Sequence, residues 1–447
     1  MRQPPTFRSP QRSASWPSWL AWALGAVSLL PVIVLAGDFS QLFWFGDEWD
    51  LLAEIERMGF WTWTWQAFAE NFVPLFKLLW YGLVVAGQGD YRVMIGALWL
   101  THALNVALFG LLLREAGCSA FVAALCLVVF GLTPTNLETL GWSVQWSAVL
   151  ALTFFLAAAW WQTRHLAQNH AWSWKKHGVL FALSAASALC FSRGVLTGAA
   201  LAAIALWPVS PRIGENWRGR LRTAFVCLAP ALAVAVLITI TQPSGGHQLW
   251  ADGQRPWADM IQYAAWYFGL NPLHRLLSVD SWGWRTTTLL TLVKLALIGW
   301  GLWRAAPPLR RLLVLLVILD LGNAALLGIG RYHTGLPTTV SSRYQYASLI
   351  CTLPFVALWM ENTLHRVRGW RPGRTGPAVA VALVVVIGWF TVRHWRQEAA
   401  VFTSSRGQYT RHLLLHDPAP PPEGAMPGIP YLKTERAKEL MRRYHLH

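Results

Sequence analysis

Hydrophobic and polar positions alternate along this chain in long blocks. Apolar runs close to twenty residues follow one another, separated by short polar connections. A helix needs about 20 apolar residues to cross a hydrocarbon core about 30 Å thick. The pattern therefore predicts an all-α polytopic membrane protein. We expect about 11 transmembrane helices, near residues 19–37, 91–113, 118–134, 137–161, 177–191, 194–209, 222–241, 286–303, 312–330, 344–360 and 376–392.

Two long polar sections, 38–90 and 242–285, interrupt these runs, and a polar tail, 393–447, follows the last one. Within the first section, Pro74 to Ala86 is apolar but short and is interrupted by Lys77, so we expect an interfacial or re-entrant helix there. The predicted organisation is a transmembrane domain over 1–392 and a separate C-terminal tail over 393–447.

The N-terminus resembles a signal peptide, because three arginines precede the first apolar run. That run is longer than the apolar region of a signal peptide, and Ala36-Gly37-Asp38 is a weak cleavage site. We therefore expect a retained first helix.

Charge sets the orientation. The chain has 37 Lys and Arg against 21 Asp and Glu, and the basic residues lie mainly between apolar runs. There they determine topology, so we expect membrane lipids and no nucleic acid as partners. With the N-terminus in the cytoplasm, the positive-inside rule places both polar sections and the tail outside, which in a bacterium is the periplasm. The five cysteines fall in or beside apolar runs, and we expect neither disulfides nor a thiolate metal site.

Three carboxylates stand close together in Gly46-Asp47-Glu48-Trp49-Asp50, in a chain where acidic residues are scarce. Carboxylates at a membrane surface bind a cation, anchor a polar group or accept a proton. The alternative is a solvated loop, or an acidic first turn of a helix that starts before Leu51.

Three arginines lie on the outer side, where the sorting rule does not explain them: Arg193, Arg331 and Arg343. The last two bracket a short loop that also holds His333, and Tyr344 follows directly. Guanidinium groups match phosphate bidentately, so these residues form a candidate phosphate site. The alternative is contact with ordinary lipid headgroups.

A base and a phosphate site on one face suggest transfer from a phosphate leaving group. A carboxylate would deprotonate a hydroxyl nucleophile, and positive charge would stabilise the departing phosphate. One carboxylate suffices for this chemistry, unlike glycoside hydrolysis, which needs two.

An ordered series of motifs resembles the GT-C superfamily of integral membrane glycosyltransferases. The series is Asp47-Glu48, Pro74-Leu75, His102-Ala103-Leu104-Asn105, Leu111 to Gly117, Pro134 to Glu138, Gly330-Arg331 and Ser342-Arg343-Tyr344. The resemblance implies a GT-C-like bundle with juxtamembrane helices on its outer face. It implies a sugar donor carried on polyprenyl phosphate, as in bacterial members of the group.

The resemblance also assigns roles to residues. Asp47 comes first, and Glu48 second, as base or acceptor-positioning group, while Asp50 is one residue beyond the usual pair. Glu138 either supports the site or caps the following helix, and His102 suits packing as well as catalysis. A divalent cation, Mg or Mn, is possible in this family, but the sequence has no second acidic pair for it.

Together these features predict a glycosyltransferase of a bacterial inner membrane. It would move a sugar from polyprenyl phosphate to a hydroxyl of a periplasmic acceptor: a protein such as pilin, a glycolipid or a polysaccharide. The alternative is a transporter or lipid flippase. Against it, the sequence has no paired half-repeats, and few ionisable residues lie inside the predicted spans: His102, Lys294 and Asp320.

Overall fold

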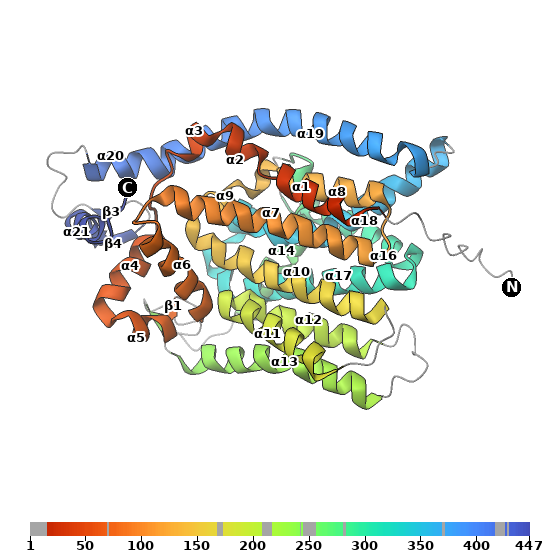
Figure 1. Ribbon diagram of the computed structural model, residues 1–447, viewed down its shortest axis with the longest axis horizontal. Coiled ribbons are helices and arrows are strands. Elements are labelled where there is room, and N and C mark those ends of the chain that lie inside the picture. Colours follow the sequence, from red (N-terminus) through yellow and green to blue (C-terminus); the bar gives the residue numbers. More distant parts are fainter. Residues whose placement is uncertain are drawn as a thin grey trace.

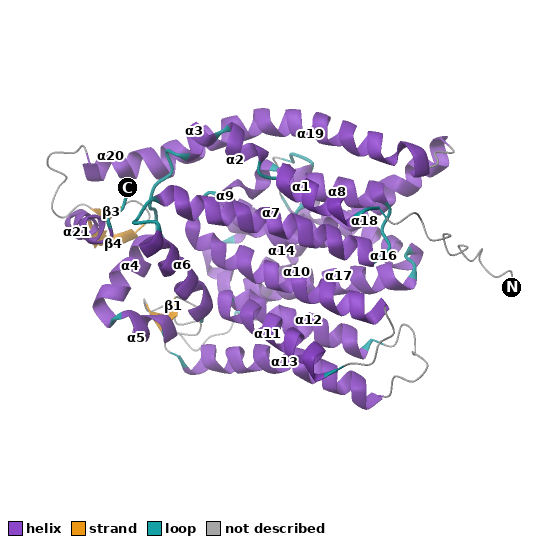
Figure 2. Ribbon diagram, in the orientation of Figure 1, coloured by secondary structure: helices purple, strands orange, loops and turns teal. Residues whose placement is uncertain are grey.

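The computed structural model describes residues 16–68, 71–167, 173–207, 217–241, 243–244, 256–279, 283–368, 372–415, 425–426 and 429–447. Helices account for most of these residues, and the strands are few and short (Figure 2). The prediction of an all-α polytopic membrane protein is confirmed.

The first half of the chain builds one side of the bundle and the section that leads into it (Figure 1). Its helices are α1 (Ser18–Val27), α2 (Leu30–Val34), α3 (Ala36–Phe39), α4 (Asp47–Met58), α5 (Phe60–Trp65), α6 (Pro74–Ala86), α7 (Tyr91–Glu115), α8 (Ala120–Leu132), α9 (Leu137–Leu140), α10 (Trp146–Ala167), α11 (Trp174–Cys190) and α12 (Val195–Leu206). Short 3-10 turns lie at Pro134–Asn136, Ser143–Gln145 and Ser192–Gly194.

The second half completes the bundle and returns to the first section. Its helices are α13 (Trp217–Ile240), α14 (Trp257–Leu270), α15 (Leu273–Leu276), α16 (Trp284–Arg304), α17 (Pro307–Arg331), α18 (Ser342–Arg368), α19 (Pro372–Thr403), α20 (Tyr409–Leu415) and α21 (Thr434–Tyr444). Two 3-10 turns, Tyr332–Thr334 and Leu336–Val340, join α17 to α18, and a π-helical turn, Ser404–Gln408, joins α19 to α20.

Six helices of the described part are long and apolar enough to cross a membrane, or seven if the bent pair α8 and Pro134–Leu140 forms one span. This is fewer than the eleven predicted spans. The predicted first span is divided into α1, α2 and α3, with Pro31 at the start of α2. The predicted spans at 177–191 and 194–209 correspond to helices of 17 and 12 residues. The bend after α8 coincides with Pro134, which the sequence identified as a helix end.

The ionisable residues inside the predicted spans are bonded to protein groups. Lys294 Nζ lies 2.5 Å from Asp320 Oδ2 and donates to the carbonyl oxygens of Phe268 and Asn271. Ser348 Oγ donates to the other carboxylate oxygen of Asp320 at 3.0 Å. Because a buried charge is tolerated when it is paired and hydrogen-bonded, this cluster acts as a cross-link between α16, α17 and α18.

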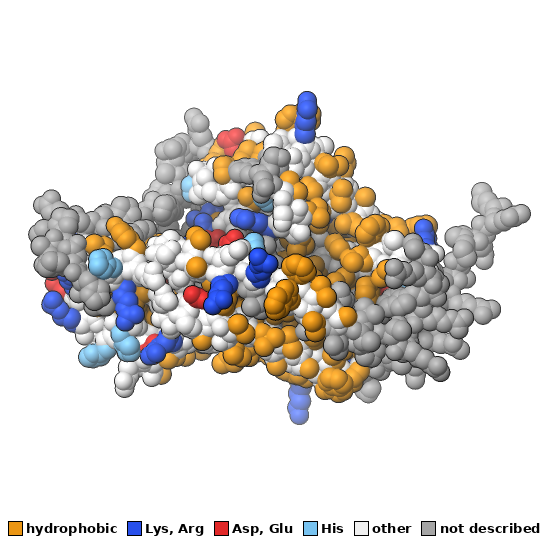
Figure 3. Space-filling view, turned by 90° about the horizontal axis from the view of Figure 1, so that it is seen from above, with side chains coloured by type: hydrophobic (Ala, Val, Ile, Leu, Met, Phe, Trp, Pro, Cys, Tyr) orange, Lys and Arg blue, Asp and Glu red, His pale blue; other side chains and the backbone are white. Residues whose placement is uncertain are grey.

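The sections predicted to lie outside gather at one end of the molecule, where α4, α5 and α6 meet α21 (Figure 1). Glu56 of α4 forms ion pairs with Arg436 and Arg443 of the tail, the second at 3.1 Å. Strand β1 (Ala67–Phe68) pairs in parallel with β2 (Pro243–Ser244), which belongs to the second polar section. Charged side chains and histidines gather toward this end, whereas hydrophobic side chains cover the middle (Figure 3).

The C-terminal tail is built into this end. Helix α19 continues across residue 392, where the sequence analysis placed a domain boundary, as far as Thr403. At the far end of the chain, His447 N donates to Gly89 O and Tyr91 N donates to His447 O, both at 3.2 Å. The tail also contains strands β3 (Ala425–Met426) and β4 (Ile429–Lys433), which pair antiparallel.

Buried aromatic side chains fix the first polar section onto the ends of the long helices. Trp44, Trp49 and Trp80 are fully buried. The Trp44 ring meets the rings of Trp80 and Tyr91 edge-on, at centroid distances of 5.9 and 5.2 Å. Such pairs contribute about 0.5–1.5 kcal/mol each beyond their buried area. The chain that leads into Asp47 is therefore held rigidly.

The contact between tail and first section requires both to lie on one side of the membrane. Glu435 in α21 and Arg304 at the end of α16 are exposed, and the five native cysteines are buried. We expect a membrane-impermeant maleimide to label a Glu435→Cys variant on spheroplasts, and an Arg304→Cys variant only after permeabilisation. Labelling of Arg304→Cys alone on sealed spheroplasts would contradict the orientation and the outer position of the arginines.

Candidate active site

The acidic cluster forms the first turn of α4. The helix begins at Asp47, and Glu48 and Asp50 follow in the same turn. Gly46 precedes it at φ +60°, and a Cβ there would lie 3.2 Å from the Trp142 ring, so glycine is required by both conformation and space. An acidic first turn was the alternative interpretation of this cluster. Three carboxylates at a helix N-terminus are favoured by the helix dipole.

Glu48 is fully buried and belongs to a hydrogen-bond network. Its Oε2 accepts from Phe45 N at 2.7 Å. Its Oε1 accepts from Tyr91 Oη at 2.8 Å and from Ser143 N and Oγ at 3.0 and 2.5 Å. Burial raises the pKa of Glu48 to about 7, although each of these hydrogen bonds lowers it. Glu48 thus connects α4 to α7 and to the turn before α10, and its oxygens face protein donors.

Asp47 occupies a different environment from its neighbour. It is half-buried, as is Asp50. Its carboxylate acts through space on the guanidinium of Arg343, which lies at the start of α18. The structure therefore brings the first of the predicted acids near one of the predicted phosphate-binding arginines.

Glu138 lies between two arginines. Its Oε2 accepts from Arg343 N and Ser341 Oγ, both at 3.1 Å, and its Oε1 pairs with Arg406 Nη2 at 3.2 Å. Glu138 therefore caps the N-terminus of α18, and not the helix over 137–161 that the sequence suggested. Its carboxylate also acts electrostatically on the Arg343 guanidinium.

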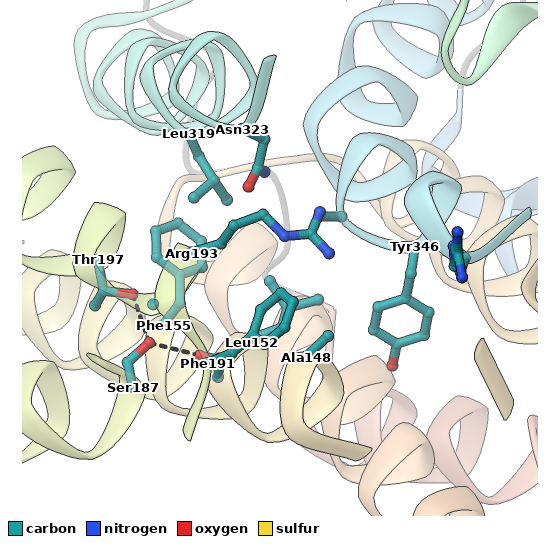
Figure 4. A pocket seen from close by; sticks show the side chains of 14 residues that line it. Ala148, Leu152, Phe155, Ser187, Phe191, Arg193, Thr197, Leu319, Asn323 and Tyr346 are labelled. Carbon is teal, nitrogen blue, oxygen red and sulfur yellow. Dashed lines mark hydrogen bonds between the residues drawn. The ribbon is translucent and has the colours of Figure 1, made fainter. Parts of the chain in front are cut away.

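A pocket opens between α10, α11, α12, α17 and α18, and it holds two of the predicted arginines, Arg193 and Arg343 (Figure 4). The pocket is partly open to solvent, and its empty space amounts to about 450 Å³ when that open part is counted. In Figure 4 the Arg193 side chain extends across the pocket toward α18, with Asn323 of α17 nearby. The opposite wall is apolar and comes from α10: Ala148, Ala151, Leu152 and Phe155. The pocket thus combines positive charge with an apolar surface.

Tyr344 connects the two guanidiniums. The Arg343 group lies 5.2 Å and the Arg193 group 5.8 Å from the centre of its ring, which is buried. Arg193 also lies 4.8 Å from the Phe191 ring. Guanidinium groups held against aromatic faces keep their N–H edges available for an anion.

Arg331 joins this group electrostatically. Burial lowers the pKa of Arg193, and the charges of Arg331 and Arg343 lower it further, whereas Tyr267 and Tyr344 raise it. The three arginines that the sequence predicts on the outer side are therefore electrostatic neighbours. An anion placed among them would relieve their mutual repulsion.

Two other predicted residues lie outside the pocket lining. His333 is exposed and meets the Tyr332 ring edge-on at 5.8 Å. His102 is buried, with Nδ1 2.9 Å from Tyr346 Oη and Nε2 3.1 Å from Gly131 O. Both of its ring nitrogens bond to protein groups, which fits the packing interpretation, and it orients Tyr346 at the pocket wall.

Two residues of the site were missed by sequence reasoning. Arg406 comes from the tail, where the sequence has none of the motifs that resemble the GT-C superfamily. Asn323 lies inside an apolar run, is 2% exposed and lines the pocket, and its Nδ2 has no hydrogen-bond partner in the described part of the chain. A polar amide at the depth of a predicted span is a signal that could have identified it.

The described residues do not assemble a set of ligands for a metal ion. No group of three or more His, Cys, Asp and Glu side chains that could hold one occurs among them. Glu48 is engaged by four donated hydrogen bonds, and Glu138 by Arg406 and the start of α18. The positive charge of this site comes from guanidinium groups.

Comparison with known proteins identifies a similar fold. No protein-family model and no curated protein matches the sequence. Among solved structures, the chain is similar to the oligosaccharyltransferase of Archaeoglobus fulgidus in its apo form, with a TM-score of 0.50 and 13% sequence identity. The match covers 97% of this chain and 60% of the archaeal one. At this identity the likeness shows the fold alone.

The two neighbouring carboxylates should differ in their effect on stability. In Glu48→Gln the amide N–H must face the backbone N–H of either Phe45 or Ser143, so a buried donor loses its acceptor. We expect this variant to lose about 1–3 kcal/mol of unfolding free energy. Asp47→Asn should unfold near the wild-type temperature. Thermal unfolding in detergent measures the stability of both variants. An unchanged melting temperature for Glu48→Gln would contradict the structural role of Glu48 in joining α4 to α7.

Proposed function

We propose that this protein is a GT-C-type glycosyltransferase that uses a sugar carried on a polyprenyl phosphate. The observation that carries the proposal is the pocket that holds Arg193 and Arg343 beside an apolar wall, with Asp47 acting on Arg343. The fold shared with an oligosaccharyltransferase supports the reaction class.

The chemistry of the pocket favours an amphipathic donor. Guanidinium groups bind a phosphate through paired, charge-assisted hydrogen bonds. The apolar side chains of α10 offer the isoprenoid chain a surface away from water. Asn323 Nδ2 adds a neutral donor for a phosphate or sugar oxygen.

In the proposed reaction an acceptor hydroxyl attacks the anomeric carbon of the sugar. Its proton passes to the Asp47 carboxylate, a new glycosidic C–O bond forms, and the bond between sugar and phosphate breaks. The phosphate departs with the electron pair and gains negative charge. Because this charge grows in the transition state, Arg343 and Arg193 stabilise that state more than the bound donor. The guanidinium groups meet this charge.

The proposed location is a bacterial inner membrane, with the pocket on the periplasmic side. The acceptor would be a hydroxyl of a protein such as pilin, of a glycolipid or of a polysaccharide. The direct test is transfer of isotope-labelled sugar from a polyprenyl-phosphate sugar by purified protein in nanodiscs. Release of free sugar or retention of the label on the lipid, with every acceptor class supplied, would contradict the proposal.

Replacement of Asp47 tests the base. Asp47→Asn keeps the size of the side chain and removes its charge, and loss of a general base costs about 10²–10⁴-fold in rate. We expect turnover to fall by that amount in the labelled-sugar assay. Asp38→Asn, a carboxylate of α3 in the same polar section, is the matched control and should keep turnover. Near-normal turnover of Asp47→Asn would rule out this residue as the base.

Replacement of Arg343 tests the leaving-group site. Arg343→Lys keeps one charge but loses the planar pair of donors, so we expect a lower turnover number with a smaller change in apparent donor affinity. Arg343→Ala should be more severe, and Arg331→Ala milder. Arg285→Ala, an exposed arginine at the start of α16, is the control. Wild-type turnover of Arg343→Ala and Arg331→Ala with saturating donor would show that this loop meets only ordinary lipid.

A further inference from the structure

The C-terminal tail reaches the segment that leads into the acidic cluster. The π-helical turn Ser404–Gln408 lies against residues 41 and 42, where a Cβ on Gly407 would come within 2.2 Å of Gln41 O. The side chain of Gln408 donates to that of Gln41. Single π-helical turns inside helices are rare and occur frequently at functional sites. Here the turn places Arg406 beside the start of α4.

Arg406 is bound on several sides. Its guanidinium lies 4.4 Å from the centre of the Phe402 ring and 5.2 Å from those of Phe45 and Trp142. Its Nη2 pairs with Glu138 Oε1 at 3.2 Å, and the side chain is 22% exposed. Its Nη1 is buried without a hydrogen-bond partner in the described part of the chain. An arginine held this firmly fixes the carboxylate that it contacts.

That carboxylate is adjacent to the phosphate pocket. Glu138 accepts a hydrogen bond from Arg343 N, and its charge acts on the Arg343 guanidinium. A glutamate without a counter-charge there would compete with a ligand phosphate for the same guanidinium. Arg406 supplies that counter-charge from the other side of Glu138.

Resting on the proposed function, we propose that Arg406 is a positioning residue of the phosphate pocket. By holding Glu138, it leaves the Arg343 guanidinium available to the phosphate of the ligand, so the tail forms part of the site. This role is distinct from direct contact with substrate. It makes a prediction that a purely structural role does not: removal of the Glu138 charge should compensate for the loss of Arg406.

The test measures binding of polyprenyl phosphate by thermal shift, with the full-length protein in nanodiscs. We expect Arg406→Ala to weaken binding about tenfold or more, because Arg343 is then drawn to Glu138. The double variant Arg406→Ala/Glu138→Gln should recover to within about threefold of wild type, since the competing charge is absent. Arg411→Ala, an exposed arginine of α20, is the matched control. If Arg406→Ala does not fold, Arg406→Gln, which removes the counter-charge of Glu138 but keeps a neutral donor, replaces it in the same comparison.

Two outcomes would overturn the inference. Wild-type binding by Arg406→Ala would show that the tail has no part in the pocket. Binding by the double variant as weak as that of the single variant would show that Arg406 does not act through Glu138. The result is separable from the proposed function, because the thermal shift does not depend on transfer. Recovery of binding by the double variant, together with a wild-type protein that transfers no sugar, would refute the transferase and leave the role of Arg406 standing.

Discussion

One end of this protein is arranged around the charge of three neighbouring arginines. Positive groups that are partly removed from water repel one another, and they are stable together only when nearby groups are arranged to meet their charge. Here three of the nearby carboxylates have different partners. Glu138 is held by Arg406 and caps α18, Glu48 is enclosed by donors of its own, and Asp47 acts electrostatically on Arg343. The pocket between the arginines is thereby left with a net attraction for an anion.

The fold makes this arrangement possible by bringing distant segments to one end. The acidic turn comes from the first polar section, Arg193 from the turn between α11 and α12, and the other arginines from the connection between α17 and α18. Buried tryptophans fix the first section, and the tail contacts it through Arg406, Arg436 and His447. The fold of the bundle is similar to that of an oligosaccharyltransferase over nearly the whole chain.

The sequence predicted the membrane class, and it placed the acidic turn and the loop between Arg331 and Arg343 on the same face. These follow from apolar run lengths and from the side of the membrane to which each loop is sorted. It did not predict that Glu48 would be buried. Adjacent residues of a helix point about 100° apart, and only tertiary packing determines which of them faces the core. The spacing of apolar residues in the sequence does not show which of these two acidic residues faces the core.

Arg406 escaped prediction for a similar reason. Its role depends on a π-helical turn and on the return of the chain across the bundle, which neither composition nor spacing encodes. The sequence predicted more spans than the six or seven helices of spanning length in the described part of the chain. Short apolar helices, such as α12, have the same local composition as helices that cross a membrane.

The central claim is that the leaving phosphate binds between Arg193 and Arg343. Electron cryo-microscopy of the protein with a bound polyprenyl-phosphate sugar tests it most directly. The account predicts phosphate density within hydrogen-bonding distance of both guanidiniums, the isoprenoid chain along α10, and the anomeric carbon facing Asp47. Phosphate density bound elsewhere, with Arg193 and Arg343 in contact only with protein, would contradict it.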